Sequence, residues 1–303
     1  MRRWSGFPGD NSDATIRRWL KDVLMGAGGS MLGDPRECAA VADRIMAGVD
    51  DRSRTVLDVL DRRYDEAELN RIGHWLDQVL AGNPVQHAVG WTDFRGLRIA
   101  CGPEALIPRP ETEEVVQWFL GGMDPVAEGR ESSTVRVVDV GTGTGCMALS
   151  IKAVRPQWEV WGMDVSEAAL ALARKNAEAL GLDVHWVLAD ALDPAATGWP
   201  DRVDGIVSNP PYIPRSEAVS MAPHVRDREP ELALFVPDSD PLVFYRALAQ
   251  RASHHLVPKG CMVAECHAEF TREVADCWQL EVGDSEVLCD LQGAERAVRL
   301  IRP

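Results

Sequence analysis

From residue 135 onward, short apolar segments alternate with helical segments, and this alternation constrains the fold more than any other feature of the chain. Strands that alternate with helices are typical of a parallel β-sheet covered by helices on both faces. The sequence therefore predicts an α/β, doubly wound sheet. The expected strands are 135–140, 160–165, 185–189, 203–207 and 261–265, and the expected helices are 146–154, 167–180 and 242–256.

Two further strand-like segments follow, 286–289 and 297–301, separated by a short polar link. Parallel strands need a connection of a dozen or more residues, whereas antiparallel strands can be joined by a short one. We therefore predict that these two strands form an antiparallel hairpin at the edge of the sheet.

The first 82 residues show helical periodicity instead. Apolar residues recur at intervals of three and four behind a Ser12–Asp13 cap and again behind Asp34-Pro35, which is typical of amphipathic helices. The apolar positions of the four expected helices include Ile16 and Leu20, Val41 and Ile45, Val56, Leu57 and Leu60, and Leu69, Ile72 and Leu76. We expect a small helical bundle over 1–82, a β-hairpin linker over 83–105 and the α/β domain over 106–303.

Composition narrows the classes of partner. The 303 residues carry a net charge of −15, which argues against direct binding of nucleic acid, because that binding depends on Lys and Arg. The longest stretch without a formal charge, 78–92, contains glycines and a proline, so neither a membrane span nor a signal peptide is predicted. We expect a cytoplasmic protein.

Seven cysteines occur without a CxxC pair, which indicates neither a disulfide framework nor a zinc ribbon. Cys261, Cys266 and His267 lie close together but within a strand-like apolar run. We therefore expect reduced thiols and no metal site.

A glycine-rich loop follows the first strand of the α/β region. Segment 135–140 runs directly into Gly141-Thr142-Gly143-Thr144-Gly145, and a glycine turn at a helix N-terminus lets the backbone approach a ligand closely. The dinucleotide motif GxGxxG would need glycine where Cys146 stands. A tight strand-to-helix turn without any ligand also fits these residues.

Two acidic residues follow the next two predicted strands. Asp164 stands where a carboxylate can accept hydrogen bonds from both ribose hydroxyls of an adenosyl ligand, and it equally fits a helix N-cap ahead of Ser166. Asp190 and Ala191 stand where folds of this kind contact the adenine, although Asp190 also fits a solvated turn. These positions add weight to a nucleoside site at the edge of the sheet.

The most specific motif is Asn209-Pro210-Pro211-Tyr212, directly after the fourth predicted strand. Two prolines stiffen the backbone and remove N–H donors. The Asn209 side-chain oxygen and the Pro210 carbonyl are then free to converge on a planar NH2 group, with Tyr212 as an aromatic wall. The alternative is a proline-stiffened strand exit without a chemical role.

Together with 141–145, this motif resembles the class I S-adenosylmethionine methyltransferases, which have a Rossmann-like sheet and include enzymes that alkylate amide or exocyclic amino nitrogens. Segments 106–113 (LIPRPETE) and 82–90 (GNPVQHAVG), behind a helical bundle, narrow the resemblance. They are similar to the protein-(glutamine-N5) methyltransferases of peptide chain release factors, the HemK/PrmC family. The resemblance covers nearly the whole chain, including Glu229-Pro230 and 293–296.

This resemblance implies that S-adenosylmethionine is the cofactor, bound over the glycine loop with its ribose on Asp164 and with Asn209 close to its methyl group. The implied substrate is a glutamine side-chain amide of a release factor, held by the four residues of the Asn209 motif. Arg109 is expected either at the mouth of the site or in an ion pair with Glu113 or Glu114.

The chain departs from the family pattern at Pro241, His267 and Ala191. These departures concern the adenine pocket and the loop after Tyr212 rather than the methyl-transfer centre. The first alternative function is a nucleic-acid adenine or guanine amino-methyltransferase, because the acceptor is again a planar NH2. The absence of Lys/Arg clusters argues against it. A nicotinamide oxidoreductase gives no account of the Asn209 motif, and a binding module without activity gives no account of an intact acceptor site.

Overall fold

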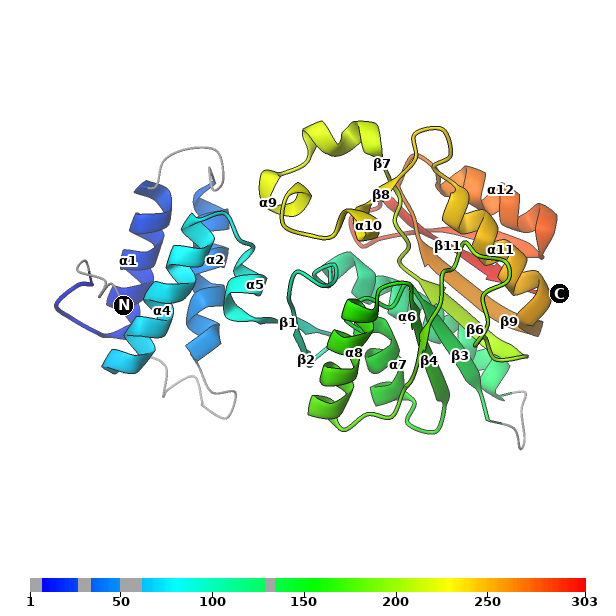
Figure 1. The fold of residues 1–303 in the computed structure, drawn as a ribbon, viewed down its shortest axis with the longest axis horizontal. Coiled ribbons are helices and arrows are strands. Elements are labelled where there is room, and N and C mark those ends of the chain that lie inside the picture. Colours follow the sequence, from blue (N-terminus) through cyan, green and yellow to red (C-terminus); the bar gives the residue numbers. More distant parts are fainter. Residues whose placement is uncertain (1–6, 27–33, 50–61, 129–133) are drawn as a thin grey trace. The chain divides into compact units, whose positions relative to one another are not determined.

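The computed structural model describes residues 7–26, 34–49, 62–128 and 134–303 (Figure 1). The chain divides into two compact units. The first comprises Met1–Trp91 together with Met221–Arg228, and the second comprises Thr92–Ser220 together with Glu229–Pro303. Each unit has its own hydrophobic core.

The first unit is helical. Helix α4 begins with a capping box, in which Asp65 accepts from the backbone N–H of Glu68 and the Glu68 side chain accepts from that of Asp65, so two otherwise unpaired donors are satisfied. The helices are α1 (Asp13–Gly26), α2 (Pro35–Val49), α4 (Glu66–Leu80), α5 (Val85–Val89) and α9 (Pro223–Arg226). The helix predicted around Val56, Leu57 and Leu60 lies outside the described residues.

The second unit is built on a mostly parallel sheet, as the alternating pattern predicts. Its strand order is β10-β11-β9-β6-β3-β4-β5, and β9, β6, β3, β4 and β5 run parallel to one another. The strands are β3 (Arg136–Val140), β4 (Glu159–Asp164), β5 (His185–Leu188), β6 (Val203–Ser208), β9 (Leu256–Glu265), β10 (Asp284–Cys289) and β11 (Glu295–Ile301).

Helices cover both faces of this sheet (Figure 1). One face packs against α6 (Pro110–Glu128), α7 (Cys146–Val154) and α8 (Glu167–Leu180), and the other packs against α11 (Val243–His255) and α12 (Thr271–Glu281). Strand β3 shows the reason: Val137 faces the first cluster and Val138 faces the second, because successive side chains of a strand point to opposite faces.

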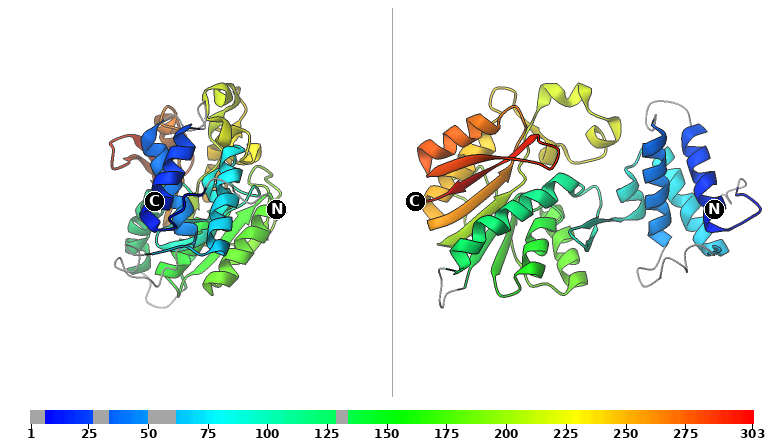
Figure 2. Two further views of the ribbon diagram at one scale, coloured as in Figure 1. Left: turned by 90° about the vertical axis from the view of Figure 1, so that its left-hand side faces the viewer. Right: turned by 180° about the vertical axis from the view of Figure 1, so that it is seen from behind.

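The C-terminal hairpin was predicted correctly. Strands β10 and β11 pair antiparallel, and β11 pairs antiparallel with β9, which puts the hairpin at the sheet edge (Figure 2, right). No helix among the described residues is both long and apolar enough to cross a membrane.

Short elements complete the chain. Strands β1 and β2 form a two-stranded sheet within 83–105, the segment predicted as a β-hairpin linker, whereas residues 85–89 of that segment form helix α5. The remaining elements are β1 (Trp91–Phe94), β2 (Leu97–Ala100), β7 (Ile213–Pro214), η1 (Arg215–Ser220), α10 (Glu231–Leu234) and β8 (Phe235–Val236).

Candidate active site

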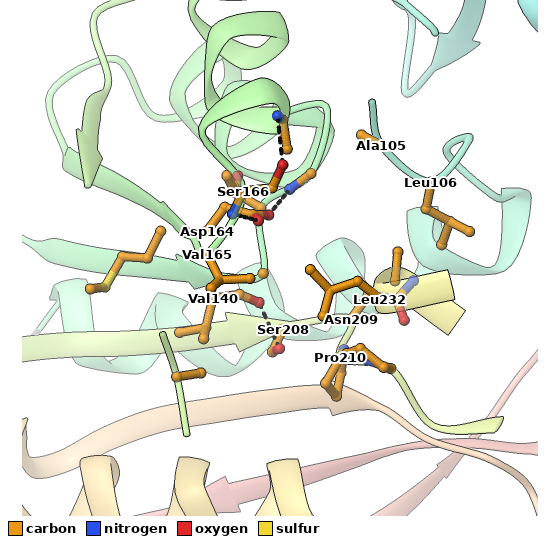
Figure 3. A pocket seen from close by; sticks show the side chains of 18 of the residues that line it. Ala105, Leu106, Val140, Asp164, Val165, Ser166, Ser208, Asn209, Pro210 and Leu232 are labelled. Carbon is orange, nitrogen blue, oxygen red and sulfur yellow. Dashed lines mark hydrogen bonds between the residues drawn. The ribbon is translucent and has the colours of Figure 1, made fainter. Parts of the chain in front are cut away.

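A cavity of about 230 Å³ opens at the carboxyl ends of β3, β4 and β6, within the second unit (Figure 3). The chain passes from β3 to β4 on one side, while β6 lies on the other side of β3. Ligands of open α/β sheets bind where the strand order reverses in this way. The cavity therefore lies at the position that the fold itself favours for a ligand.

Residues 141–144 of the glycine loop line this cavity. Gly141, Gly143 and Gly145 all have positive φ angles, of 71°, 55° and 81°, a conformation that glycine adopts without steric cost. A Cβ added at Gly143 would meet only the Ala105 Cβ, at 3.8 Å. The space in front of Gly143 is thus open for a ligand.

Asp139 lies beneath the loop and is fully buried. Its Oδ2 accepts from Thr142 Oγ1 at 2.7 Å and from the Ala148 backbone N–H at 3.1 Å, which ties the loop to helix α7. Burial raises the pKa of Asp139 to about 7, against the opposing effect of those hydrogen bonds. Sequence reasoning assigned no role to this residue.

Asp164 lines the cavity at the end of β4. Its two oxygens accept from the backbone N–H groups of Gly143 and Ser166, each at 2.9 Å, and burial raises its pKa. Ser166, not Asp164, is the N-cap of α8, because its side chain accepts from the Ala169 N–H. Each carboxylate oxygen retains acceptor capacity, so Asp164 can also accept from a ligand.

Asp190 and Ala191 line the same cavity after β5. Asp190 Oδ1 accepts from the Leu192 N–H at 2.8 Å, a local turn that leaves its other oxygen available. Trp199 and Leu248 contribute apolar surface to the cavity, as a flat aromatic ligand requires.

The Asn209 motif takes part both in the lining of the cavity and in a hydrogen-bond network with Thr112 and Glu265. Asn209, Pro210 and Pro211 line the cavity, and Figure 3 shows Asn209 and Pro210 beside Leu232. Asn209 Nδ2 donates to Thr112 Oγ1 at 3.1 Å. Tyr212 is not among the described residues that line the cavity.

The Tyr212 hydroxyl instead donates to Glu265 Oε1 at 3.1 Å. Burial, the Glu265 charge and this hydrogen bond raise the Tyr212 pKa well above its usual value. The Tyr212 ring also contacts His267 edge-on, and His267 lies 3.4 Å from the Glu217 carboxylate. Contacts on this side of the motif thus hold Tyr212 in place.

Arg109 lines the cavity, and the alternative expectation, an ion pair with Glu113 or Glu114, is wrong. Arg109 Nη2 lies 2.5 Å from Glu229 Oε1, whereas Glu113 and Glu114 accept from the backbone N–H groups of Arg95 and Leu291. The fully buried Glu229 side chain also accepts from the Ile107 N–H at 2.9 Å. Glu229 therefore joins segment 107–109 to the segment that leads into α10.

Thr112, Glu229 and Glu265 were not predicted as site residues. Glu265 ends the expected strand 261–265, and a carboxylate at the carboxyl end of a parallel strand was the available signal. Thr112 and Glu229 belong to segments whose only sequence signal is the resemblance to the family. Thr112 is 153 positions from Glu265, and Glu229 is 120 positions from Arg109.

Comparison with known proteins decides the family. Over 289 residues the chain is 37% identical to the release factor glutamine methyltransferase of Bacteroides thetaiotaomicron, covering 93% of this chain and 96% of that protein. The chain belongs to the release factor glutamine methyltransferase family. The enzyme of the same name from Cereibacter sphaeroides is 40% identical over 223 residues, covering 72% of this chain and 74% of that protein.

Other comparisons agree with this family. Residues 127–224 match the Methyltransferase small domain. The human Mettl16 catalytic domain, solved in complex with the MAT2A 3′UTR hairpin 6, has a similar fold, with a TM-score of 0.53 and 15% identity over 85% of this chain and 91% of that chain. For this member of the release factor glutamine methyltransferase family, the structural likeness confirms the α/β fold.

Proposed function

We propose that this protein transfers a methyl group from S-adenosylmethionine to the side-chain amide nitrogen of a glutamine in a peptide chain release factor, in the cytoplasm. The observation that carries the proposal is the position of Asn209 and Pro210 on the cavity that the glycine loop and Asp164 also line. A nucleoside-type ligand and an amide acceptor can therefore meet in one space.

The residues around the cavity fit S-adenosylmethionine. The open space in front of Gly143 admits the cofactor. Asp164 retains acceptor capacity for the ribose hydroxyls of the cofactor. Asp190 and Ala191, with Trp199 and Leu248, supply a half-apolar wall for the adenine. When bound, the sulfonium supplies an electrophilic methyl group.

The acceptor nitrogen needs orientation more than it needs a base. An amide nitrogen is a poor nucleophile because its lone pair is delocalised into the carbonyl. Asn209 Oδ1 and the Pro210 carbonyl each accept one N–H of the substrate amide, which turns the lone pair toward the methyl group. Both acceptors face the atom that gains positive charge, so they bind the transition state more strongly than the ground state.

The bonds balance without an added reagent. A nitrogen–carbon bond forms as the carbon–sulfur bond breaks, and the leaving group is the neutral thioether S-adenosylhomocysteine. The alkylated nitrogen then loses a proton to water, because an N-alkylated amide cation is strongly acidic. Arg109, held by Glu229 at the cavity, is proposed to line the entry for the substrate.

The helical first unit is proposed to position the release factor. Sequence motifs for chemistry lie in the second unit, which leaves the bundle over 1–82 for recognition of the protein substrate. Residues 83–105 then serve as the linker to the methyltransferase domain over 106–303.

The deciding experiment presents purified protein and methyl-labelled S-adenosylmethionine with a release factor, with duplex DNA and with RNA in separate reactions. We expect label in the release factor, on one glutamine-containing peptide. Label in nucleic acid and none in the release factor would instead favour an amino-methyltransferase of adenine or guanine.

A further inference from the structure

Glu265 is a buried carboxylate beside the proposed acceptor site. Strand β9 runs parallel to β6 with Ala264 paired to Ser208, so the next residues of the two strands, Glu265 and Asn209, emerge side by side at the carboxyl edge of the sheet. Glu265 is only 2% exposed. A charged group in such a position needs hydrogen-bond donors around it.

Two hydroxyl groups supply those donors. Thr112 Oγ1 donates to Glu265 Oε2 at 2.7 Å, and Tyr212 Oη donates to Oε1 at 3.1 Å. Burial raises the pKa of Glu265, while these two hydrogen bonds and the charge of Arg296 lower it. The Thr112 hydroxyl is the donor in its contact with Glu265 Oε2, so its single proton points toward Glu265.

The direction of that proton decides how Thr112 meets Asn209. A threonine hydroxyl has one proton and two acceptor lone pairs. With its proton committed to Glu265, Thr112 Oγ1 can only accept from the Asn209 side chain, 3.1 Å away. The Asn209 atom that faces Thr112 is therefore Nδ2, and Asn209 Oδ1 lies on the other side of the amide.

We propose that Glu265 and Thr112 are positioning residues that select the orientation of the Asn209 amide in which Oδ1 meets the substrate nitrogen. The inference rests on the proposed function of Asn209. The two ends of an amide are nearly equal in size, so packing alone does not distinguish them. An amide turned by 180° would direct its own N–H groups at the N–H groups of the substrate, and transfer would slow.

Threonine variants test this chain of contacts. Thr112→Val keeps the size of the side chain and removes the acceptor, so we expect the single-turnover rate of release factor methylation to fall about 10- to 100-fold, the range found for residues that orient metal ligands. Thr112→Ser keeps the hydroxyl, so its methylation rate should fall by less than about 10-fold, the lower end of that range. The calorimetric Kd for S-adenosylmethionine should stay unchanged in both.

Thr271→Val is a matched control. Thr271 is also buried, stands at the start of a helix and donates to a glutamate, Glu295, but it is not among the described residues that line the cavity. We expect a wild-type methylation rate. An equal loss in Thr112→Val and Thr271→Val would show general destabilisation and overturn the proposal.

A double-mutant cycle shows whether Thr112 acts through Asn209. With Asn209→Ala in place there is no amide to orient, so adding Thr112→Val should cause no further loss, and the two effects should not multiply. Glu265→Gln provides a second route, because its NH2 can donate to Thr112 and release the Thr112 proton toward Asn209. That variant should slow turnover and should likewise add nothing to Asn209→Ala.

The outcomes separate this inference from the function on which it rests. Wild-type turnover in Asn209→Ala would overturn both. A slow Asn209→Ala with a wild-type rate in Thr112→Val, or with losses that multiply in the double variant, would overturn the positioning role alone. A slow Thr112→Val that Thr112→Ser rescues, with no added loss in the double variant, supports it.

Discussion

Asp164 Oδ2 accepts the backbone N–H of Gly143 at 2.9 Å, so the carboxylate at the end of β4 and the glycine loop after β3 are one structural unit. The other oxygen of Asp164, Oδ1, accepts the backbone N–H of Ser166 just before α8. A single side chain thus fixes the shape of the loop and, in the proposed complex, also holds the ribose.

Replacement of Asp164 should therefore weaken cofactor binding. Asp164→Ala loses one or two charge-assisted hydrogen bonds to ribose, roughly 1.5–3 kcal/mol each, and we expect the Kd for S-adenosylmethionine in calorimetry to rise at least tenfold. Asp193→Ala is the control, since Asp193 is an exposed turn residue that accepts from the Ala195 N–H. An unchanged Kd in Asp164→Ala would remove Asp164 from the ribose site.

A side chain at Gly143 should block the ligand itself. Gly143→Val fills the space in front of the loop, so S-adenosylmethionine binding should be lost in calorimetry. Gly96→Val is matched in backbone strain, because Gly96 also has a positive φ, of 80°, and has open space around it. Each variant pays about 1–2 kcal/mol of strain, but only Gly143→Val should lose binding. Equal affinities in the two variants would contradict the cofactor assignment.

The buried Asp139 should make the stability of the protein depend on pH. Its pKa in the folded state is raised from 3.8 to about 7, so between these values the folded state holds a proton that the unfolded state has released. The contribution of Asp139 to stability is therefore most favourable below pH 3.8, and the free energy of unfolding falls as pH rises toward 7. Above about pH 7, the pKa in the folded state, Asp139 lowers the free energy of unfolding no further.

Urea unfolding of Asp139→Asn at several pH values measures this effect. Between about pH 5 and about pH 8, the free energy of unfolding of the wild type should fall by roughly 2–3 kcal/mol more than that of the variant, on the scale of about 1.36 kcal/mol per pKa unit. Identical pH profiles for wild type and Asp139→Asn would show that the Asp139 carboxyl group is already ionised in the folded state at about pH 5.

The parts of the fold that sequence predicts best are those in which neighbouring residues carry the signal. The alternation of apolar strands and helices predicts which segments of the α/β region are strands and which are helices, and the short link before 297–301 predicts the antiparallel hairpin. Segment 85–89 falls within 83–105, which the sequence predicts as a β-hairpin linker, yet it forms helix α5 after Pro84. Its apolar positions are too few to define a period.

Contacts between distant residues explain what sequence reasoning missed in the site. Glu229 and Arg109 are 120 positions apart, and Glu265 and Thr112 are 153 positions apart. Glu113 and Glu114 were considered for Arg109 only because they are near in sequence. The position of Glu265 beside Asn209 depends on the register of β9 against β6, which no local pattern encodes.

The proposed role of the helical bundle leads to a test by truncation. A chain without residues 1–82 keeps the described residues that line the cavity, so calorimetry should show cofactor binding close to that of the full chain. Methylation of an intact release factor should fall sharply, because the surface proposed to position the protein is gone. Full activity of the truncated chain would show that the bundle is dispensable.

Asn209 is the residue on which the proposed chemistry depends most directly. Asn209→Ala removes one preorganised acceptor, and loss of such a contact lowers kcat by on the order of 10²–10³, while the Kd for S-adenosylmethionine should change little.

Asn209→Asp is the sharper variant, because it keeps the shape and an acceptor oxygen but places a negative charge beside Thr112, whose proton already points to Glu265. The added carboxylate has no N–H to donate to Thr112 Oγ1, so two acceptors would face each other at 3.1 Å. We therefore expect Asn209→Asp to be impaired as well, and Thr112→Val to relieve part of that impairment in a single-turnover assay. Wild-type turnover in Asn209→Ala with the cofactor bound would mean that the acceptor amide binds elsewhere and that the two prolines only stiffen the exit of β6.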